Sequence, residues 1–550
     1  MDSFDHLATA ARAYQAQLPS RRVFPSPEAI AALSTLPASL PETGLPLEHI
    51  LALLANTVAP ATVLTTSGRY FGFVTGGSLP AALAANQLAA VWDQNAALRI
   101  MSPAAVELES VALRWIADFL HLPPTSLGAF VSGATMANFT AMAAARHALL
   151  AAQCQDVESL GLFAAPPFPV LVGEQAHVSV FKALAMLGLG RDRVIRVPSD
   201  SQGRMRPDAF PSLSQPALVC LQAGNVNTGA LDSPELIPLA KQSNSWVHVD
   251  GAFGLWSPNA NYAAADSWAT DGHKWLNVPY DSGIVFVRDP QALSGAMALT
   301  ASYLDPGAEI EPMQRAPESS RRARGIDTWA ALLSLGRTGL SEMIERCCRH
   351  ARHFASILAL HNVEILNEVS LNQVLAALPS DQQTLAWLQA VQAEGECWLG
   401  STIWSGRRAL RISVSSWATT DQDVERSLAS LLRHLPAKST GRLSAQRQPL
   451  SPGPVLPAPA LIHSPPRLSA PAAIPVACRL APPVSVRAAA PPPALLHGQC
   501  AGPRSVRLFA AGPSALARSG PALPSSRKCV SSESSPFLAE SPVPGRSRDS

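Results

Sequence analysis

Four short apolar runs in the middle of the chain constrain its fold more than any other feature of the sequence. Each run is four to five residues long and rich in valine, leucine or isoleucine, and helical stretches lie between them. The runs are 169–172, 217–221, 246–249 and 284–287. Continuous apolar strands that alternate with helices are typical of a largely parallel sheet whose two faces are both covered. The sequence therefore predicts an α/β fold.

The chain divides into four segments by composition and periodicity. Helical spacing with prolines as punctuation marks the first segment, strand–helix alternation the second, and longer helices with shorter strands the third. The predicted segments are an N-terminal helical segment (1–95), a large domain (96–300), a smaller α+β domain (301–435) and a tail (436–550). In the third segment we expect helices at 328–350, 381–394 and 421–434 and a strand at 410–414.

The tail differs from the rest of the chain in proline content and charge. Residues 436–550 contain 22 of the 49 prolines, and their 13 Lys/Arg against 3 Asp/Glu give +10, whereas the preceding residues carry −8. Repeated prolines cannot sustain a helix or a central strand, so we predict disorder. A basic, proline-rich tail could bind nucleic acid or a proline-recognising module. A dispensable extension or a reading-frame artefact is the favoured interpretation, and we expect no nucleic-acid partner.

Cysteine spacing and the N-terminus restrict the class of protein further. None of the eight cysteines forms a C-x-x-C pair, so neither a zinc site nor a redox pair is indicated. We expect reduced thiols, a cytoplasmic location and no metal. The first residues lack a basic stretch followed by an apolar run, so a secretory signal is not expected. No uninterrupted apolar window reaches about 18 residues, which argues against a membrane span.

Two groups of opposite charge, Asp250 and Lys274, lie 24 residues apart in the middle of the chain. Asp250 ends the strand at 246–249, with the small Ala252 just behind it, and Lys274 lies within 269–277. Pyridoxal phosphate chemistry requires an amine that forms an imine and a carboxylate that holds the pyridinium. We expect surroundings that partly deprotonate that amine. Taken singly, Asp-Gly is a common turn and a lone lysine is usually a surface residue. The hypothesis of a pyridoxal phosphate site therefore depends on Asp250 and Lys274 occurring together.

Other loops at strand ends offer the remaining groups that such a cofactor needs. A Ser-Gly-Ala-Thr turn at 132–135 precedes a helical run and presents N–H groups and hydroxyls to a phosphate, although an ordinary helix cap is the alternative. His177 could stack on the ring, although a lone histidine is more often structural. The candidate cofactor-binding residues are Gly133, Ala134, Thr135, His177, Asn225, Thr228, Asp250, Ala252, His273 and Lys274.

The order of these motifs resembles the group II pyridoxal phosphate-dependent decarboxylases, of fold type I. The similarity covers roughly residues 45–435, and its most specific part is His273-Lys274-Trp275 after the strand that ends at Asp250. That family includes aromatic amino acid, histidine and glutamate decarboxylases. The resemblance implies a mainly parallel seven-stranded sheet, bound pyridoxal phosphate, an amino-acid substrate and a homodimer.

The resemblance also implies roles for single residues. Lys274 would form the Schiff base, Asp250 would pair with the ring nitrogen, and His177 would stack on the ring and assist the last protonation. Gly133, Ala134, Thr135 and His273 would hold the phosphate. Tyr70, Phe71 and Phe73 are candidates for the substrate pocket and Arg411 for a carboxylate, although each could be structural. The implied reaction releases carbon dioxide from an L-amino acid.

One departure from the family leaves the product open. Many members carry a tyrosine proton donor in a loop after the lysine, but residues 305–320 contain none, and the nearest upstream aromatic residue is Tyr303. Tyr70 or His177 could donate instead. An aminotransferase, an aldehyde-forming decarboxylase or a carbon–carbon lyase is the alternative enzyme. A binding protein with a vestigial site is a third possibility, and the intact lysine and aspartate argue against it.

Overall fold

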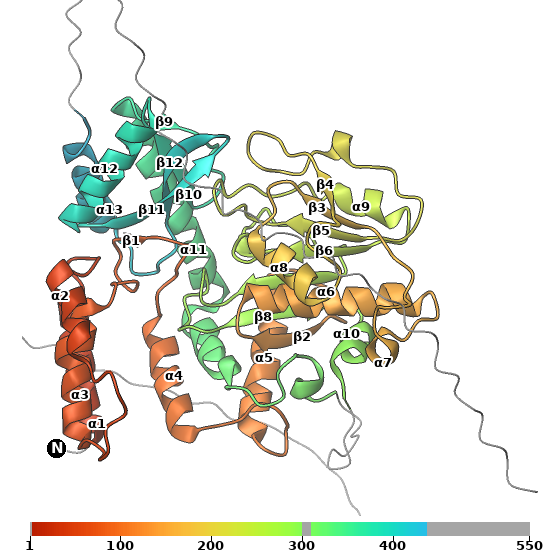
Figure 1. Ribbon diagram of the computed structural model, residues 1–550, viewed down its shortest axis with the longest axis horizontal. Helices are drawn as coiled ribbons and strands as arrows, with labels where there is room; N and C mark the ends of the chain where they lie inside the picture. Colours follow the sequence, from red (N-terminus) through yellow and green to blue (C-terminus); the bar gives the residue numbers. More distant parts are fainter. Residues whose placement is uncertain (1–2, 300–309, 437–550) are drawn as a thin grey trace, which may run out of the picture. The chain divides into compact units, whose positions relative to one another are not determined.

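A seven-stranded sheet lies at the centre of the protein, whose computed structural model describes residues 3–299 and 310–436 (Figure 1). The sheet has the order β2-β8-β7-β6-β5-β3-β4. Its strands are β2 (Leu127–Val131), β3 (Val170–Gly173), β4 (Ile195–Val197), β5 (Leu218–Gln222), β6 (Trp246–Asp250), β7 (Ser267–Asp271) and β8 (Gly283–Val287). Strand β8 is antiparallel to β2 and β7, while the other neighbouring pairs are parallel. The predicted mainly parallel sheet is confirmed.

Both faces of this sheet are buried, as the continuous apolar runs predict. In β5, Leu218 and Cys220 belong to one apolar core, whereas Val219 and Leu221 belong to the other. Helices α6, α8 and α10 cover the first face (Figure 1), and residues of α5, α9 and α11 line the second core. The helices of this region are α5 (Pro103–Phe119), α6 (Ala134–Ala151), α7 (Val157–Leu160), α8 (Val178–Met186), α9 (Leu236–Lys241) and α10 (Pro290–Met297). Polar groups can therefore reach a ligand only at the edges of the sheet.

A second, five-stranded sheet has the order β1-β11-β12-β10-β9. Its strands are β1 (Tyr70–Phe71), β9 (Glu364–Ile365), β10 (Gln373–Ala377), β11 (Trp398–Trp404) and β12 (Arg407–Ser413), with helices α11 (Arg324–Leu360), α12 (Asp381–Glu394) and α13 (Asp421–Arg433). These elements confirm the helices and the strand expected after residue 325. Strand β1 comes from the segment predicted to be helical and runs parallel to β11. Helix α11 contains a kink at Gly336, whose φ of 61° favours glycine.

Apart from β1, the regular elements of the first hundred residues are helices. The α-helices are α1 (Ser3–Gln17), α2 (Pro27–Ala32), α3 (Leu47–Leu53) and α4 (Pro80–Trp92). Over the whole described chain, short 3-10 or π turns lie at Leu33–Thr35, Leu54–Val58, Ala59–Ala61, Pro207–Ala209, Gly254–Trp256 and Pro312–Gln314. Within the described residues, no helix is both long and apolar enough to cross a membrane. The expected tail from residue 437 onward and Tyr303 lie outside the described part of the chain.

A buried ion pair joins α5 to the segment that leads into α11. Arg321 donates from both terminal nitrogens to Glu109, at 2.9 and 2.6 Å, and the two side chains are 1% and 3% exposed. A two-bond guanidinium–carboxylate contact satisfies much of the hydrogen-bonding capacity of both groups. Loss of one partner would leave the other charged group buried without compensation.

We therefore expect Glu109→Ala to lower the free energy of unfolding by about 3–5 kcal/mol, measured by urea denaturation. The matched control is Glu364→Ala, which removes the exposed pair with Arg407 and should change stability little. Similar losses in both variants would contradict a buried, uncompensated arginine as the cause.

Candidate active site

Polar side chains gather at the edge of the seven-stranded sheet where the parallel strands end. Gln222 of β5 lies beside Asp250 of β6, and Asp250 lies beside Ala269 of β7 in the next pairing. A cavity of about 470 Å³ opens at this edge. Of the predicted site residues, it is lined by Gly133, Ala134, Thr135, His177, Asp250, Ala252, His273, Lys274 and Arg411. The structure thus brings together residues that are almost 280 positions apart in the chain.

Lys274 is held by a carboxylate that the sequence reasoning did not assign. Its Nζ lies 2.9 Å from Oδ2 of Asp271, the last residue of β7, and the lysine side chain is 20% exposed. Burial lowers the pKa of Lys274, but the charge of Asp271 and its hydrogen bond outweigh that effect, so the pKa is raised. The expectation of surroundings that deprotonate the amine is therefore wrong here, because Asp271 stabilises the ammonium form.

Asp250 is buried and faces the cavity from the end of β6. Its Oδ1 accepts a hydrogen bond from the backbone N–H of Ala252 at 3.3 Å, and its Oδ2 lies 3.5 Å from Oγ of Ser179. Both contacts are long, so the carboxylate retains capacity for a stronger donor. A pyridinium N–H is a donor of that kind.

His177 is the residue immediately before α8. Its Nδ1 lies 2.8 Å from Oγ of Ser179 and accepts the backbone N–H of Ser179 at 3.3 Å. Burial lowers the pKa of His177; Asp250 acts against burial, and Lys274 acts with it. The imidazole is therefore neutral near pH 7, as suits a residue that packs against a flat ring.

The turn after β2 forms the start of α6, an 18-residue helix. A Cβ atom on Gly133 would lie 3.5 Å from the His273 ring and 3.7 Å from Oδ1 of Asp271, a buried oxygen without a hydrogen-bond partner among the described residues. A Cβ on Gly283 would approach the backbone of Gly133 to 2.4 Å. Gly283 thus lets β8 pack closely against the start of α6, where Gly133, Ala134 and Thr135 line the cavity. The first N–H groups of a helix have no partner within the helix, so this position favours a phosphate.

His273 faces that space with a defined tautomer. Its Nδ1 accepts the backbone N–H of Ser282 at 3.1 Å, so its proton is on Nε2, which lies 3.7 Å from Asp271. Its ring stacks on Tyr280, with centroids 4.2 Å apart. Together with the turn at Gly133, His273 fits the phosphate role that the resemblance implied.

Arg411 projects from β12 of the second sheet to the same cavity. It donates from Nη1 to the carbonyl of Val226 at 3.3 Å, and its Nε is buried without a partner among the described residues. Burial lowers the pKa of Arg411, although a guanidinium stays charged at any working pH. No described carboxylate pairs with it, so it is free to bind an anionic ligand.

Four of the predicted site residues do not line the cavity, and they are Tyr70, Phe71, Asn225 and Thr228. The Asn225 side chain accepts the N–H groups of Asn227 and Thr228, and its amide nitrogen donates to Gln175 and Gln222. Thr228 donates to the carbonyl of Gln202. These bonds leave neither side chain available to a cofactor.

One of the three aromatic candidates for the substrate pocket lines the cavity. Tyr70 stacks on Trp398 with centroids 5.2 Å apart, and Phe71 packs edge-on against Phe354 in the core. Phe73 lines the cavity as predicted, together with Val74, and both have positive φ. Burial raises the pKa of Tyr70 to about 12, so its hydroxyl keeps its proton.

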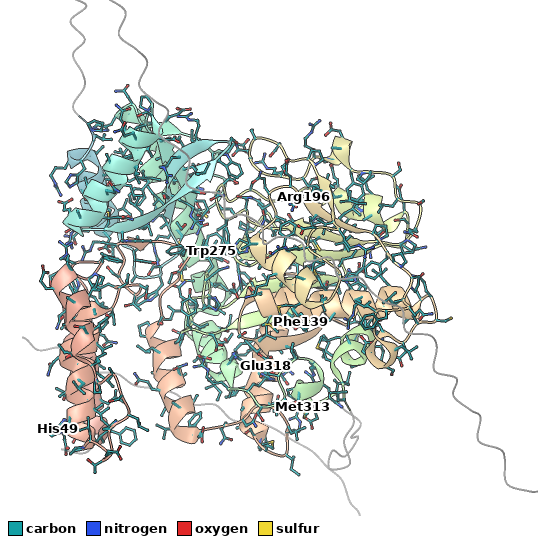
Figure 2. All side chains as sticks on the ribbon, viewed as in Figure 1. His49, Phe139, Arg196, Trp275, Met313 and Glu318 are labelled. Carbon is teal, nitrogen blue, oxygen red and sulfur yellow. The ribbon has the colours of Figure 1, made fainter. Side chains whose placement is uncertain are left out.

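The sequence reasoning missed other residues of the lining. These are Gln222, Gly224, Val226, Ser179, Phe253 and Asp271. Asp271 lies three residues before Lys274, within the segment 269–277, but β7 gave no apolar signal, so its place at a strand end could not be predicted. Trp275, which follows Lys274 and is labelled in Figure 2, is fully buried. It packs edge-on against Phe253. This anchor holds the backbone of Lys274 against the core.

A family model for the pyridoxal-dependent decarboxylase conserved domain matches residues 27–378. An aromatic-L-amino-acid decarboxylase from Bacillus atrophaeus is 28% identical over 332 residues, which is 56% of this chain and 67% of the relative. An L-2,4-diaminobutyrate decarboxylase from Rhizobium meliloti is 28% identical over 433 residues, 72% of this chain and 81% of the relative.

Solved structures show the same fold. The crystal structure of Oryza sativa TDC with PLP and tryptamine has a TM-score of 0.71 at 22% identity, covering 79% of this chain and 98% of that one. Mouse CSAD has the same TM-score and the same coverage. Apart from Arg411, the residues that line the cavity lie within residues 27–378, which the family model matches.

The Lys274–Asp271 ion pair should set the pH range in which the lysine amine captures an aldehyde. Asp271→Asn removes the negative charge that raises the pKa of Lys274, so more neutral amine is present at a given pH. We expect the pH at which pyridoxal phosphate capture reaches half its maximal rate to fall, measured by borohydride trapping and mass spectrometry of the Lys274 peptide. Lys274→Ala, the control, should trap nothing there, and an unchanged midpoint in Asp271→Asn would contradict the assignment.

Proposed function

The chain belongs to the pyridoxal-dependent decarboxylase family, and we propose that it releases carbon dioxide from an L-amino acid at the cavity around Lys274. One observation carries this function: Lys274, at the end of β7, and Asp250, at the end of the neighbouring β6, line the same cavity. Bound pyridoxal phosphate supplies an electron sink for the bond that breaks. The residues described above fit that cofactor at its aldehyde, its ring nitrogen and its phosphate.

Lys274 supplies the amine that holds the cofactor, and Asp271 controls its charge. The amine must lose a proton before it can attack a carbonyl carbon. Oδ2 of Asp271, at 2.9 Å, is the acceptor closest to that proton. Asp250 has the complementary task, because a buried carboxylate with only long contacts keeps a proton on the ring nitrogen.

Arg411 and His177 support substrate orientation. The guanidinium enters the cavity from the second sheet, whereas the imidazole enters from the first. A guanidinium is suited to hold a carboxylate, and holding it in one orientation selects the bond that breaks. The pocket's apolar side, with Phe73, Val74 and Phe253, is where we place the amino-acid side chain.

A product panel tests this function. After reconstitution with pyridoxal phosphate, the full chain should release carbon dioxide and amine from at least one aromatic, acidic, imidazole or diamino amino acid. Lys274→Ala should abolish turnover, and Asp250→Asn should lower kcat by about 100-fold or more, because the ring nitrogen loses its counter-charge. Pyridoxal phosphate bound without release of carbon dioxide from any panel member would contradict the proposal.

An aldehyde-forming reaction is the second candidate. A phenylacetaldehyde synthase from Petunia hybrida is 25% identical over 349 residues, 59% of this chain and 69% of the relative. Loss of carbon dioxide and ammonia to give an aldehyde is an oxidation, so dioxygen would have to be consumed and reduced to hydrogen peroxide. Equal yields of amine with and without oxygen, and no peroxide, would exclude it.

We also propose a homodimer in the cytoplasm. Exposed apolar side chains on α4, Leu88, Val91 and Trp92, support an interface between two copies of the chain. The five cysteines within the described residues are all free, which suits a reducing compartment. Light scattering after size exclusion should give twice the mass of one chain, and Trp92→Glu should shift the species towards the monomer. A wild-type monomer at assay concentrations would contradict the dimer.

A further inference from the structure

A buried chain of hydrogen bonds runs from the indole of Trp246 in β6 to His177 at the cavity. Its intermediate members are all buried, and they come from β7, β6, α6 and α8. The successive distances are Trp246 Nε1 to Ser267 Oγ 2.9 Å, Ser267 Oγ to His248 Nδ1 3.0 Å, His248 Nε2 to Asn138 Oδ1 2.9 Å, Asn138 Nδ2 to Ser179 Oγ 3.3 Å, and Ser179 Oγ to His177 Nδ1 2.8 Å.

Trp246 and Asn138 together set the direction of donation. An indole N–H can only donate, so Ser267 accepts that bond. The Asn138 oxygen can only accept, so Nε2 of His248 carries the ring proton and Nδ1 accepts the Ser267 hydroxyl proton. Burial lowers the pKa of His248 to about 3, so the ring is neutral and carries one N–H. That N–H is on Nε2 and donates to Oδ1 of Asn138.

Asn138 donates the next hydrogen bond of the chain, to Ser179. Its oxygen already faces a donor, so its amide nitrogen donates to the Ser179 hydroxyl. That hydroxyl has two possible acceptors, His177 Nδ1 at 2.8 Å and Asp250 Oδ2 at 3.5 Å. The shorter bond is favoured, because 3.5 Å lies beyond the usual range for a hydroxyl donor.

We propose that Ser179 is a positioning residue that fixes His177 as the tautomer with its proton on Nε2. Nδ1 of His177 accepts from both the hydroxyl and the backbone N–H of Ser179, whereas Nε2 has no partner among the described residues. His177 therefore presents an N–H donor at the cavity. Because the Ser179 proton is directed to His177, Oδ2 of Asp250 stays free to accept a stronger donor.

The positioning role of Ser179 deepens the proposed function. It rests on that function only for the identity of the ligand that contacts the Nε2–H of His177. A neutral ring with an outward N–H packs against a flat cofactor without adding positive charge beside the pyridinium. The same N–H can donate to an anionic oxygen of the substrate. The Ser179 chain thus selects one of two imidazole forms with different binding properties.

Removal of the Ser179 hydroxyl has a defined effect on His177. Burial lowers the pKa of His177, Asp250 and Asp271 raise it, and Lys274 and Arg411 lower it further. A hydroxyl that donates to Nδ1 stabilises the unprotonated nitrogen, so it acts in the same direction as burial. Without it, the pKa of His177 must rise and the competing tautomer must gain population.

Nitrogen-15 NMR of the full chain, labelled at histidine, tests the proposal before and after incubation with pyridoxal phosphate. His177→Gln assigns the signals. Wild type should show Nδ1 unprotonated at neutral pH. Ser179→Ala should show a measurable population of the other tautomer and a His177 acid dissociation constant lowered by roughly 3- to 10-fold, the equivalent of one hydrogen bond. Ser179→Thr, which keeps the hydroxyl, should restore both values.

Ser427→Ala is the matched control. Ser427 is a buried helix serine whose hydroxyl donates to the Asp423 carbonyl in α13. It should alter stability without moving the His177 signals. If Ser179→Ala leaves tautomer and titration as in wild type, Ser179 is only a structural residue of α8 and the proposal is overturned.

A second variant keeps the proposal testable if Ser179→Ala does not fold. Asn138→Asp places an acceptor where the amide donates, so the Ser179 hydroxyl should turn towards it and Nδ1 of His177 should gain the proton. An unchanged tautomer in this variant would overturn the proposal. Failure of wild type to form a borohydride-stable adduct would contradict the proposed function, but it would not affect the measurement made before pyridoxal phosphate is added.

Discussion

Burial of the seven-stranded sheet on both faces is the constraint from which the site follows. In every strand except the edge strand β4, alternate residues enter two separate apolar cores, so most of the sheet offers no polar face to a ligand. The edge where the parallel strands end is where loops and helix starts converge. Asp250 and Asp271 are the last residues of β6 and β7, and Lys274 follows within three residues. The fold therefore concentrates charge at one place.

The charged groups of the site differ in whether they have a partner of opposite charge. Asp271 pairs with Lys274 at 2.9 Å, while Asp250 has only long contacts and Arg411 only a carbonyl. Charges in a partly buried cavity interact more strongly than in water, so an unpaired carboxylate and an unpaired guanidinium favour ligands of opposite charge. The two unsatisfied groups come from different sheets, which separates the ring-nitrogen end of the site from the carboxylate end.

Much of this arrangement could be predicted from the sequence. The strands at 169–172, 217–221, 246–249 and 284–287 carry continuous apolar runs, and they match β3, β5, β6 and β8. Strand β7 was missed, because Ser267, Thr270 and Asp271 give it no apolar signal. Tertiary partners satisfy these polar groups: Trp246 donates to Ser267 and Trp256 donates to Thr270. No pattern within five residues could reveal such partners.

The sequence by itself determined the mainly parallel sheet and indicated Lys274, Asp250 and the turn at Gly133 as candidates for one site, because periodicity and short motifs are local properties. Only the tertiary structure decided which polar side chains remain available. It assigned Asp271 to Lys274, paired the side chains of Asn225 and Thr228 with the carbonyls of Gln175 and Gln202, and buried Phe71 in the core. The physical reason is that hydrogen-bond partners and burial depend on residues far apart in the chain, which composition and spacing do not encode.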